Sequence, residues 1–199
     1  MSLYQFAPTP TCGVSEHDFV TWENGFSTEE IKKIIEYGDN LTTSTASVFG
    51  DSDLKKVRRS QVAWIDNNPD TGWFYDRMAW IARQLNGQFF KFDLFGFVED
   101  FQYTVYDEKE LGHYDWHVDR GTLKDGMSPR KLSLVLQLSH EYEYDGGELQ
   151  IMSGPNPQSV KKERGLVAAF PSYMLHRVTP VTAGVRKTLV VWTSGPAFK

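Results

Sequence analysis

The chain has 199 residues, of which 40% are hydrophobic and 14% aromatic, so it can bury a full core and is not a disordered protein. Its net charge of -5 gives no general basic surface for nucleic acid, and no apolar run is long enough to span a membrane. Cys12 is the only cysteine, and no signal-peptide pattern is seen, so we expect no disulfide framework and a cytoplasmic location. We expect one domain over residues 1–199.

The N-terminal half is expected to provide helical support, over residues 15–87. Residues 19–22 favour a short strand, and Ser27 with Glu30 forms a capping-box pattern that predicts a helix over 28–38. The polar segment 44–57 is interpreted either as a lid over a site or as a solvated connection.

Two further elements are predicted before residue 88. Residues 58–65 favour one strand. An apolar stripe at helical spacing then predicts a core helix, with Asp70 or Thr71 as its N-cap and Asn86-Gly87 as its end.

From residue 88 to about 195 the pattern favours short strands. Phe90, Phe92, Phe95 and Phe97 begin this aromatic region, and Leu132 to Leu138 then alternate apolar and mostly polar positions, which is typical of a strand. Further strands are predicted over 148–152, 166–170, 176–178 and 187–193. Helices in the N-terminal half and strands in the C-terminal half indicate an α+β fold with a jelly-roll core.

Two overlapping His-x-Asp pairs lie within residues 106–119. They are His113 with Asp115, and His117 with Asp119. Residues two apart on a strand share a face, so either pair can bind one metal ion. A second histidine would complete the 2-His-1-carboxylate set of non-haem Fe(II) oxygenases. Because all four positions share a face in one continuous strand, the spacing leaves both pairs open.

His176 is the candidate for the second histidine, because His17 and His140 lie in polar surroundings that indicate surface positions. A lone histidine in an apolar stretch is more often a hydrogen-bonded core residue than a ligand. The upstream His-x-Asp pairs shift the balance toward a ligand.

Arg186 lies on an otherwise apolar predicted strand, where it shares a face with Thr188, Val190 and Trp192. Burying an arginine alone is costly, so it needs an anionic partner. An internal ion pair is the simpler explanation for one such residue. Beside a metal triad, a carboxylate-bearing cosubstrate is the better partner.

Taken in order, these residues resemble the Fe(II)/2-oxoglutarate-dependent dioxygenases, in particular their prolyl 4-hydroxylase-like branch, over residues 58–192. The matching elements are Tyr106, Gly112-His113-Tyr114, His117-Val118-Asp119, Gly146-Gly147-Glu148-Leu149, Pro171-Ser172, Leu175-His176, Val178-Thr179-Pro180-Val181, Gly184-Val185-Arg186 and Trp192. The family places its cosubstrate-binding basic residue ten positions after the distal histidine, as Arg186 follows His176.

The resemblance favours His117 and Asp119 over the other pair, because the family has a tyrosine three residues before the metal histidine, as Tyr114 stands here. The chain departs from the family where relatives often carry a tyrosine facing 2-oxoglutarate. Leu136-Gln137-Leu138 stands there, so either Gln137 or Tyr106 is expected to make that hydrogen bond.

The resemblance implies a double-stranded β-helix and an enzyme that uses Fe(II), 2-oxoglutarate and O2, with ascorbate as an optional addition. It implies His117, Asp119 and His176 as catalytic metal ligands. Arg186, with Tyr106, Thr188 and Val178, would bind the cosubstrate, which is converted to succinate and CO2. The substrate side is expected to include Tyr114, Trp116, Arg120 and Trp192, although Trp116 fits a core position equally well.

A prolyl residue in a peptide or protein is the substrate that the resemblance favours. A free amino acid or small metabolite competes on the same chemistry. A non-catalytic or isomerase-type cupin would have more histidines and no need of Arg186. Nucleic-acid demethylation would need a basic groove, which the net charge and the acidic run 141–145 argue against. The pattern predicts no nucleic-acid or membrane partner and leaves the oligomeric state open.

Overall fold

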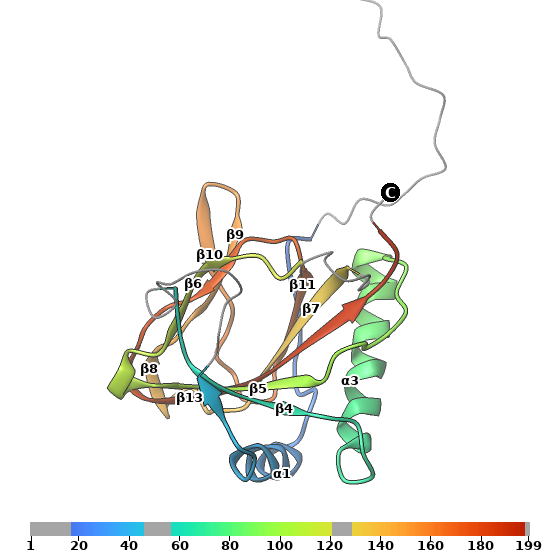
Figure 1. Cartoon of the computed structure of the whole chain (residues 1–199). Coiled ribbons are helices and arrows are strands. Elements are labelled where there is room, and N and C mark those ends of the chain that lie inside the picture. The colour runs from blue at the N-terminus through green and yellow to red at the C-terminus, as the bar shows by residue number, and fades with distance from the viewer. Residues whose placement is uncertain (1–16, 46–56, 121–128, 198–199) are drawn as a thin grey trace, which may run out of the picture.

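The computed structural model describes residues 17–45, 57–120 and 129–197. In these residues two antiparallel sheets face each other, and two helices cover the outer face of the larger sheet (Figure 1). This arrangement confirms the predicted α+β fold with a jelly-roll core. No helix of the described ranges is long and apolar enough to cross a membrane.

The larger sheet has the strand order β1-β11-β7-β13-β5-β4-β2, and β8 pairs with the start of β13. Its strands are β1 (Val20–Trp22), β2 (Ser44–Thr45), β4 (Gln61–Ile65), β5 (Phe101–Asp107), β7 (Arg130–Gln137), β8 (Tyr144–Gly146), β11 (Val167–Pro171) and β13 (Val181–Ser194). The long strand β13 runs between β5 and β7 and is central to the sheet.

The smaller sheet has five strands in the order β10-β9-β12-β6-β3. They are β3 (Arg58–Arg59), β6 (His113–His117), β9 (Leu149–Ser153), β10 (Asn156–Ser159) and β12 (His176–Val178). Strands β6 and β12 are neighbours in this sheet, which brings together residues about 60 positions apart in the sequence.

Helix α1 (Thr28–Asp39) begins with the predicted capping box. The Ser27 side chain accepts a hydrogen bond from the Glu30 amide, and the Glu30 carboxylate accepts one from the Ser27 amide. Helix α3 (Gly72–Leu85) buries its apolar stripe, which includes Phe74, Met78 and Ile81, against the sheet.

Each central strand of the larger sheet has one face toward the helices and one toward the smaller sheet. On β7, Leu132, Leu134 and Leu136 join the helix-side core, while Val135 joins a second core between the sheets. The alternation seen in the sequence therefore separates a packing face from an interior face. The candidate site lies on the interior face.

Two local predictions differ in part from the structure. The predicted strand 58–65 is broken at Ser60, so that β3 pairs with β6 in one sheet and β4 with β5 in the other. The α-helix α3 ends at Leu85 with Asn86 as its C-cap, as predicted, but the chain stays helical beyond that point. A π-helical turn, η1 (Asn86–Phe90), follows α3 and buries Phe90, and it ends at Lys91 with φ 55.

The other predictions for these segments have mixed outcomes. Thr71 occupies the N-cap of α3 but makes no capping hydrogen bond there. Phe95 and Phe97 lie outside regular strands, because β5 begins only at Phe101. Phe97 packs against the core, with its ring 4.9 Å from that of Phe101, whereas Phe95 is exposed. Of the predicted lid, residues 46–56 lie outside the described residues.

Candidate metal centre

His117, Asp119 and His176 lie together at the mouth of the space between the sheets. One ligand atom from each lies within 4.8 Å of the others. His117 ends β6 and stands opposite His176 of β12 in the strand register. Asp119 lies just beyond the end of β6, and its two carboxylate oxygens are 3.6 Å from His117 Nε2 and 3.4 Å from His176 Nε2.

The backbone fixes the tautomer of both histidines. Nδ1 of His117 lies 2.7 Å from the carbonyl oxygen of Asp115, and Nδ1 of His176 lies 2.9 Å from that of Met174. A carbonyl oxygen only accepts, so each Nδ1 must donate its hydrogen. Both Nε2 atoms then keep their lone pairs, which is the form in which imidazole binds a metal.

Two buried serines, Ser133 and Ser172, fix the position of Asp119. Ser133 on the interior face of β7 donates to Oδ2 of Asp119 at 2.8 Å, and its own hydroxyl lies 3.0 Å from that of Ser172. The Asp119 amide also donates to the Ser172 carbonyl at 2.8 Å. These contacts orient Asp119 although it lies outside a strand. The sequence analysis did not identify either serine as part of the site, although Ser133 is a polar residue on the interior face of a buried strand.

The electrostatic environment favours the metal-binding protonation states of His117 and Asp119. Burial, together with the nearby His176, lowers the pKa of His117 to about 4. Burial alone would raise the pKa of Asp119, but His176 and His117 hold it below its ordinary value. At neutral pH His117 is therefore a neutral imidazole and Asp119 a carboxylate.

The alternative pair lies apart from this cluster. The ring of His113 makes its Nδ1 contact with the Leu111 carbonyl at 2.8 Å. The Asp115 carboxylate is exposed and accepts a hydrogen bond from the Trp116 amide. The structure thus gathers the second His-x-Asp pair, and not the first, around His176.

Arg186 lies deep between the sheets with only 1% of its surface exposed. It stands opposite Tyr106 in the strand register, and its guanidinium carbon is 5.3 Å from the Tyr106 ring centre. Its Nη2 donates to the Gln137 side chain at 3.2 Å, while its Nε makes no hydrogen bond within the described chain. No described carboxylate forms an ion pair with this guanidinium, so the alternative explanation of Arg186, an internal ion pair, is not observed in the described ranges.

These residues fit the metal and the cosubstrate that the sequence predicts. Two imidazoles and one carboxylate form the facial set that non-haem Fe(II) oxygenases use, and the three side chains reach it without rearrangement of the strands. The second part of the site is the buried guanidinium of Arg186 and the hydroxyl of Thr188, the next residue on the interior face of β13. Neither Nε of Arg186 nor this hydroxyl has a hydrogen-bond partner in the described residues, so the two groups suit an anionic ligand that accepts hydrogen bonds.

Comparison with known proteins gives the same assignment. Residues 101–194 match the family model of the 2OG-Fe(II) oxygenase superfamily, and this segment holds the whole triad and Arg186. These residues belong to the 2OG-Fe(II) oxygenase superfamily.

Relatives of the oxygenase domain include two proteins described as PKHD-type hydroxylases. One, from Synechococcus sp., is 41% identical over 85 residues, which is 43% of this chain and 37% of the relative. One from Shewanella oneidensis is 40% identical over 81 residues, which is 40% of this chain and 36% of the relative. The chain thus matches little more than a third of the length of these relatives.

Solved structures share the fold over most of the chain. A Pseudomonas putida prolyl-4-hydroxylase superposes with a TM-score of 0.72 at 19% identity, covering 92% of this chain and 95% of the other. A Trichoplax adhaerens prolyl hydroxylase in complex with a peptide fragment of the hypoxia inducible factor oxygen degradation domain gives 0.75 at 14% identity, covering 90% and 84%. Both confirm the jelly-roll architecture of the oxygenase domain.

Two of the predicted substrate residues flank the triad. The Tyr114 ring stacks on that of His117 with centroids 3.4 Å apart, and the guanidinium carbon of Arg58 lies 4.5 Å from the centre of the Tyr114 ring. Trp192 is packed under the Arg130 guanidinium at 3.7 Å and lies 6.2 Å from Trp64. These contacts hold both aromatic rings at fixed positions next to the metal centre of the oxygenase domain.

The other predicted residues are placed differently. Val178 is buried beside Tyr114 in the core between the sheets. Trp116 lies next to His117 on β6 and so points to the opposite face of the strand, where Arg177 covers its ring at 4.6 Å. Arg120 is exposed at the edge of the described residues.

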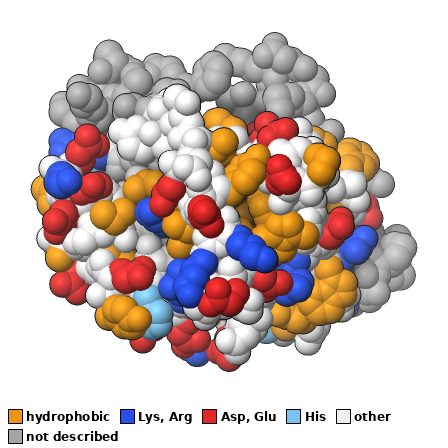
Figure 2. Space-filling view, turned by 90° about the horizontal axis from the view of Figure 1, so that it is seen from below, with side chains coloured by type: hydrophobic (Ala, Val, Ile, Leu, Met, Phe, Trp, Pro, Cys, Tyr) orange, Lys and Arg blue, Asp and Glu red, His pale blue; other side chains and the backbone are white. Residues whose placement is uncertain are grey.

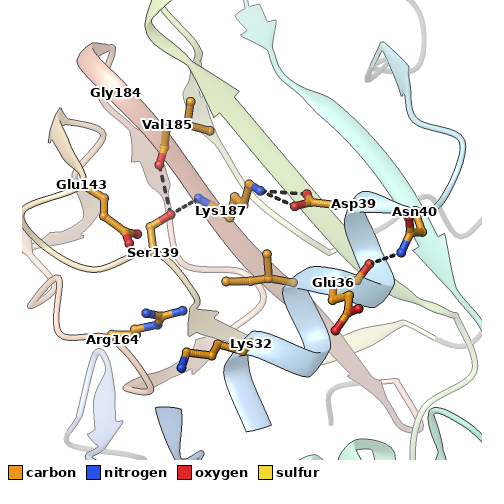
Figure 3. Close-up of a pocket in the computed structure, with 11 residues that line it drawn as sticks. Lys32, Glu36, Asp39, Asn40, Ser139, Glu143, Arg164, Gly184, Val185 and Lys187 are labelled. Carbon is orange, nitrogen blue, oxygen red and sulfur yellow. Dashed lines mark hydrogen bonds and ion pairs between the residues drawn. The ribbon is translucent and has the colours of Figure 1, made fainter. Parts of the chain in front are cut away.

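A separate open pocket of about 890 Å³ lies between α1 and β13 (Figure 3). Lys187 lines it and pairs with Asp39 at 2.6 Å, whereas its neighbour Arg186 points to the other face of the strand. Seen from below, acidic and basic side chains are interspersed on the surface, without a continuous basic area (Figure 2). This pocket contains neither the triad nor Arg186.

Proposed function

We propose that the chain is an Fe(II)- and 2-oxoglutarate-dependent dioxygenase that hydroxylates a C–H bond, with a prolyl residue in a peptide or protein as its substrate. The observation that carries the proposal is the buried Arg186, which has no described carboxylate partner and lies between the same two sheets as the triad. A structural arginine would be expected to have an internal anion. An arginine that receives a carboxylate cosubstrate would not.

Each residue of the triad has a defined task in this proposal. His117 and His176 would hold Fe(II) through Nε2, because their Nδ1 atoms are engaged by backbone carbonyls. Asp119 would supply the anionic ligand, oriented by Ser133. Bound Fe(II), 2-oxoglutarate and O2 together supply the oxidant for C–H hydroxylation, with release of succinate and CO2.

The remaining interior residues bind the cosubstrate and exclude water. Arg186 would pair with the distal carboxylate of 2-oxoglutarate, and Thr188 and Tyr106 would complete the polar and aromatic walls around it. Val178 and Phe170, both buried between the sheets, keep the space near His176 apolar. A dry site protects a reactive oxidant from side reactions.

The surface around the metal centre supports a peptide substrate. Val118 and Leu175 adjoin the triad in the sequence and are exposed, as is Trp64 beside Trp192. Exposed apolar side chains with nearby arginines suit an extended peptide better than a small polar metabolite. The peptide held by the Trichoplax relative and the prolyl hydroxylases among the structural neighbours agree with this choice. The single cysteine supports a cytoplasmic site of action.

The metal assignment is tested by comparing three histidine variants. The purified protein is incubated with Fe(II), 2-oxoglutarate and ascorbate, and succinate is measured. We expect His117→Ala and His176→Ala to lose metal-dependent succinate formation and His113→Ala to keep it. Turnover that survives in His117→Ala but not in His113→Ala would refute the choice of pair.

The cosubstrate and substrate assignments need separate readouts. Arg186→Ala should weaken 2-oxoglutarate binding, and an unchanged affinity would overturn that role. For the substrate, Pro-rich peptides and free amino acids are incubated with the complete reaction mixture, and mass spectrometry detects the gain of one oxygen atom. Product from free proline alone would replace the peptide substrate with a small-molecule one.

A further inference from the structure

Tyr144 contributes a phenol to the Arg186 cavity from a strand outside the path of the main sheet. It begins β8, which pairs with the first residues of β13, and it stands opposite Gly184 in that register. Its side chain is buried in the core between the sheets, together with Tyr106 and Val181. The residue lies 42 positions before Arg186 in the sequence, so no local pattern connects the two.

The side chains of Tyr144 and Arg186 both lie next to Gly147. A Cβ atom added to this glycine would lie 3.0 Å from Cδ of Arg186 and 3.1 Å from Cε2 of Tyr144. Gly147 also has φ 57, a conformation that favours glycine. Because Gly147 has no Cβ atom, the aliphatic part of the Arg186 side chain and the ring of Tyr144 can both pack against it.

The polar atoms gathered here are mostly without protein partners. The hydroxyl groups of Tyr144 and Thr188 and Nε of Arg186 are buried and make no hydrogen bond within the described residues. Thr188 stands opposite Gln137 in the register, and Gln137 accepts from Arg186. Burial raises the pKa of Tyr144, and the charge of Arg186 together with its close side-chain contact opposes this rise only in part, so the phenol keeps its proton and can donate it.

We infer that Tyr144 is a cosubstrate-binding residue whose hydroxyl donates to the distal carboxylate of a five-carbon 2-oxo dicarboxylate, beside Arg186 and Thr188. The inference rests on the proposed function and assigns to Tyr144 a role that the sequence analysis gave to Gln137 or Tyr106. The hydroxyl groups of Tyr144 and Thr188 and the Nε–H of Arg186 are three donors without protein partners, and one carboxylate can accept hydrogen bonds from all three. Gln137 acts with them by orienting the guanidinium through its carbonyl oxygen.

Tyr144→Phe tests the assignment because it removes only the hydroxyl group. Binding of 2-oxoglutarate is measured by calorimetry without O2, in the presence of Mn(II) so that no turnover occurs. We expect affinity to fall roughly ten- to hundredfold, the usual effect of losing a hydrogen bond to a charged group. Tyr142→Phe is the matched control, since Tyr142 lies two residues away and is largely exposed, and its affinity should equal that of the wild type.

The melting temperature of the ligand-free protein is a second measurement, and it is not expected to fall when the affinity for 2-oxoglutarate falls. A buried hydroxyl without a partner destabilises the folded state, so Tyr144→Phe should melt at or above the wild-type temperature while it binds 2-oxoglutarate less well. A lower melting temperature would mean that the protein itself satisfies the hydroxyl, and this would overturn the inference. Wild-type affinity in Tyr144→Phe would overturn it as well.

The same experiment separates this inference from the proposed function. If the wild type binds 2-oxoglutarate with metal and Arg186→Ala does not, the proposed cosubstrate site stands whatever Tyr144→Phe shows. If the wild type binds no 2-oxoglutarate in the presence of Mn(II), the proposed function fails and the role of Tyr144 fails with it.

Discussion

Removal of the Ser133 hydroxyl should weaken metal binding without touching a metal ligand. Ser133 is fully buried and donates to Oδ2 of Asp119 at 2.8 Å. A hydrogen bond to a charged acceptor contributes about 1.5–3 kcal/mol. In Ser133→Ala the backbone amide of Asp119 keeps its hydrogen bond to the Ser172 carbonyl, but the carboxylate loses the donor that orients it. We therefore expect affinity for Fe(II) or Co(II) to fall by about 10- to 100-fold, the range typical of residues that orient metal ligands.

The assay is an anaerobic titration of the metal-free protein with Co(II), followed by its visible absorption and by calorimetry. Ser194→Ala is the matched control, because Ser194 is a buried serine of the same sheet whose hydroxyl has no hydrogen-bond partner within the described chain. Ser133→Thr retains a hydroxyl and should restore both the affinity and the spectrum of the bound metal. Equal Co(II) affinity and an identical spectrum in Ser133→Ala and the wild type would refute the orienting role.

Three further changes test other parts of the fold and the site. Gly147→Ala forces a non-glycine residue to φ 57 and places a Cβ 2.9 Å from Val181, so we expect a loss of about 1–3 kcal/mol in the free energy of unfolding together with weaker 2-oxoglutarate binding. Ser27→Ala removes the helix cap of α1 and should cost about 1 kcal/mol in chemical denaturation, with unchanged cosubstrate affinity. Burial raises the pKa of Tyr75 from 10.0 to about 12, so its stabilising contribution is complete below pH 10 and is lost as the pH rises toward 12. The stability advantage of the wild type over Tyr75→Phe should therefore shrink across that interval, and a constant difference would contradict the assignment.

The period-two pattern of the buried strands carried most of the information that the sequence offered. On β7 the leucines pack against the helices, and the alternate positions Ser133 and Gln137 face the site. On β13 the same alternation directs Arg186 and Thr188 to the interior. A strand has no freedom to turn a single side chain to the other face. The fold class and the interior positions of Arg186 and Thr188 could therefore be predicted from local sequence, whereas the contact of Ser133 with Asp119 could not.

Contacts that depend on the path of the chain between strands could not be predicted in this way. The break at Ser60 moves β3 to one sheet and β4 to the other, yet residues 58–65 look like one strand in the sequence. The π-helical turn after α3 forms because Phe90 is buried, which overrides the usual effect of Asn86-Gly87. In both cases tertiary packing determines the outcome, and this packing cannot be predicted from the local sequence pattern.

The unpaired polar atoms around Arg186 connect stability with function. Each buried donor without a partner costs about 1–3 kcal/mol in the ligand-free protein, and a buried cation costs more. Such groups persist in a strand as central as β13 when a ligand compensates for them. The triad differs in this respect, because Nδ1 of both histidines and Oδ2 of Asp119 are already satisfied by the protein. In the proposed enzyme the metal ligands would thus be oriented before metal binds, whereas the cosubstrate end of the site would become fully hydrogen-bonded only when a carboxylate enters it.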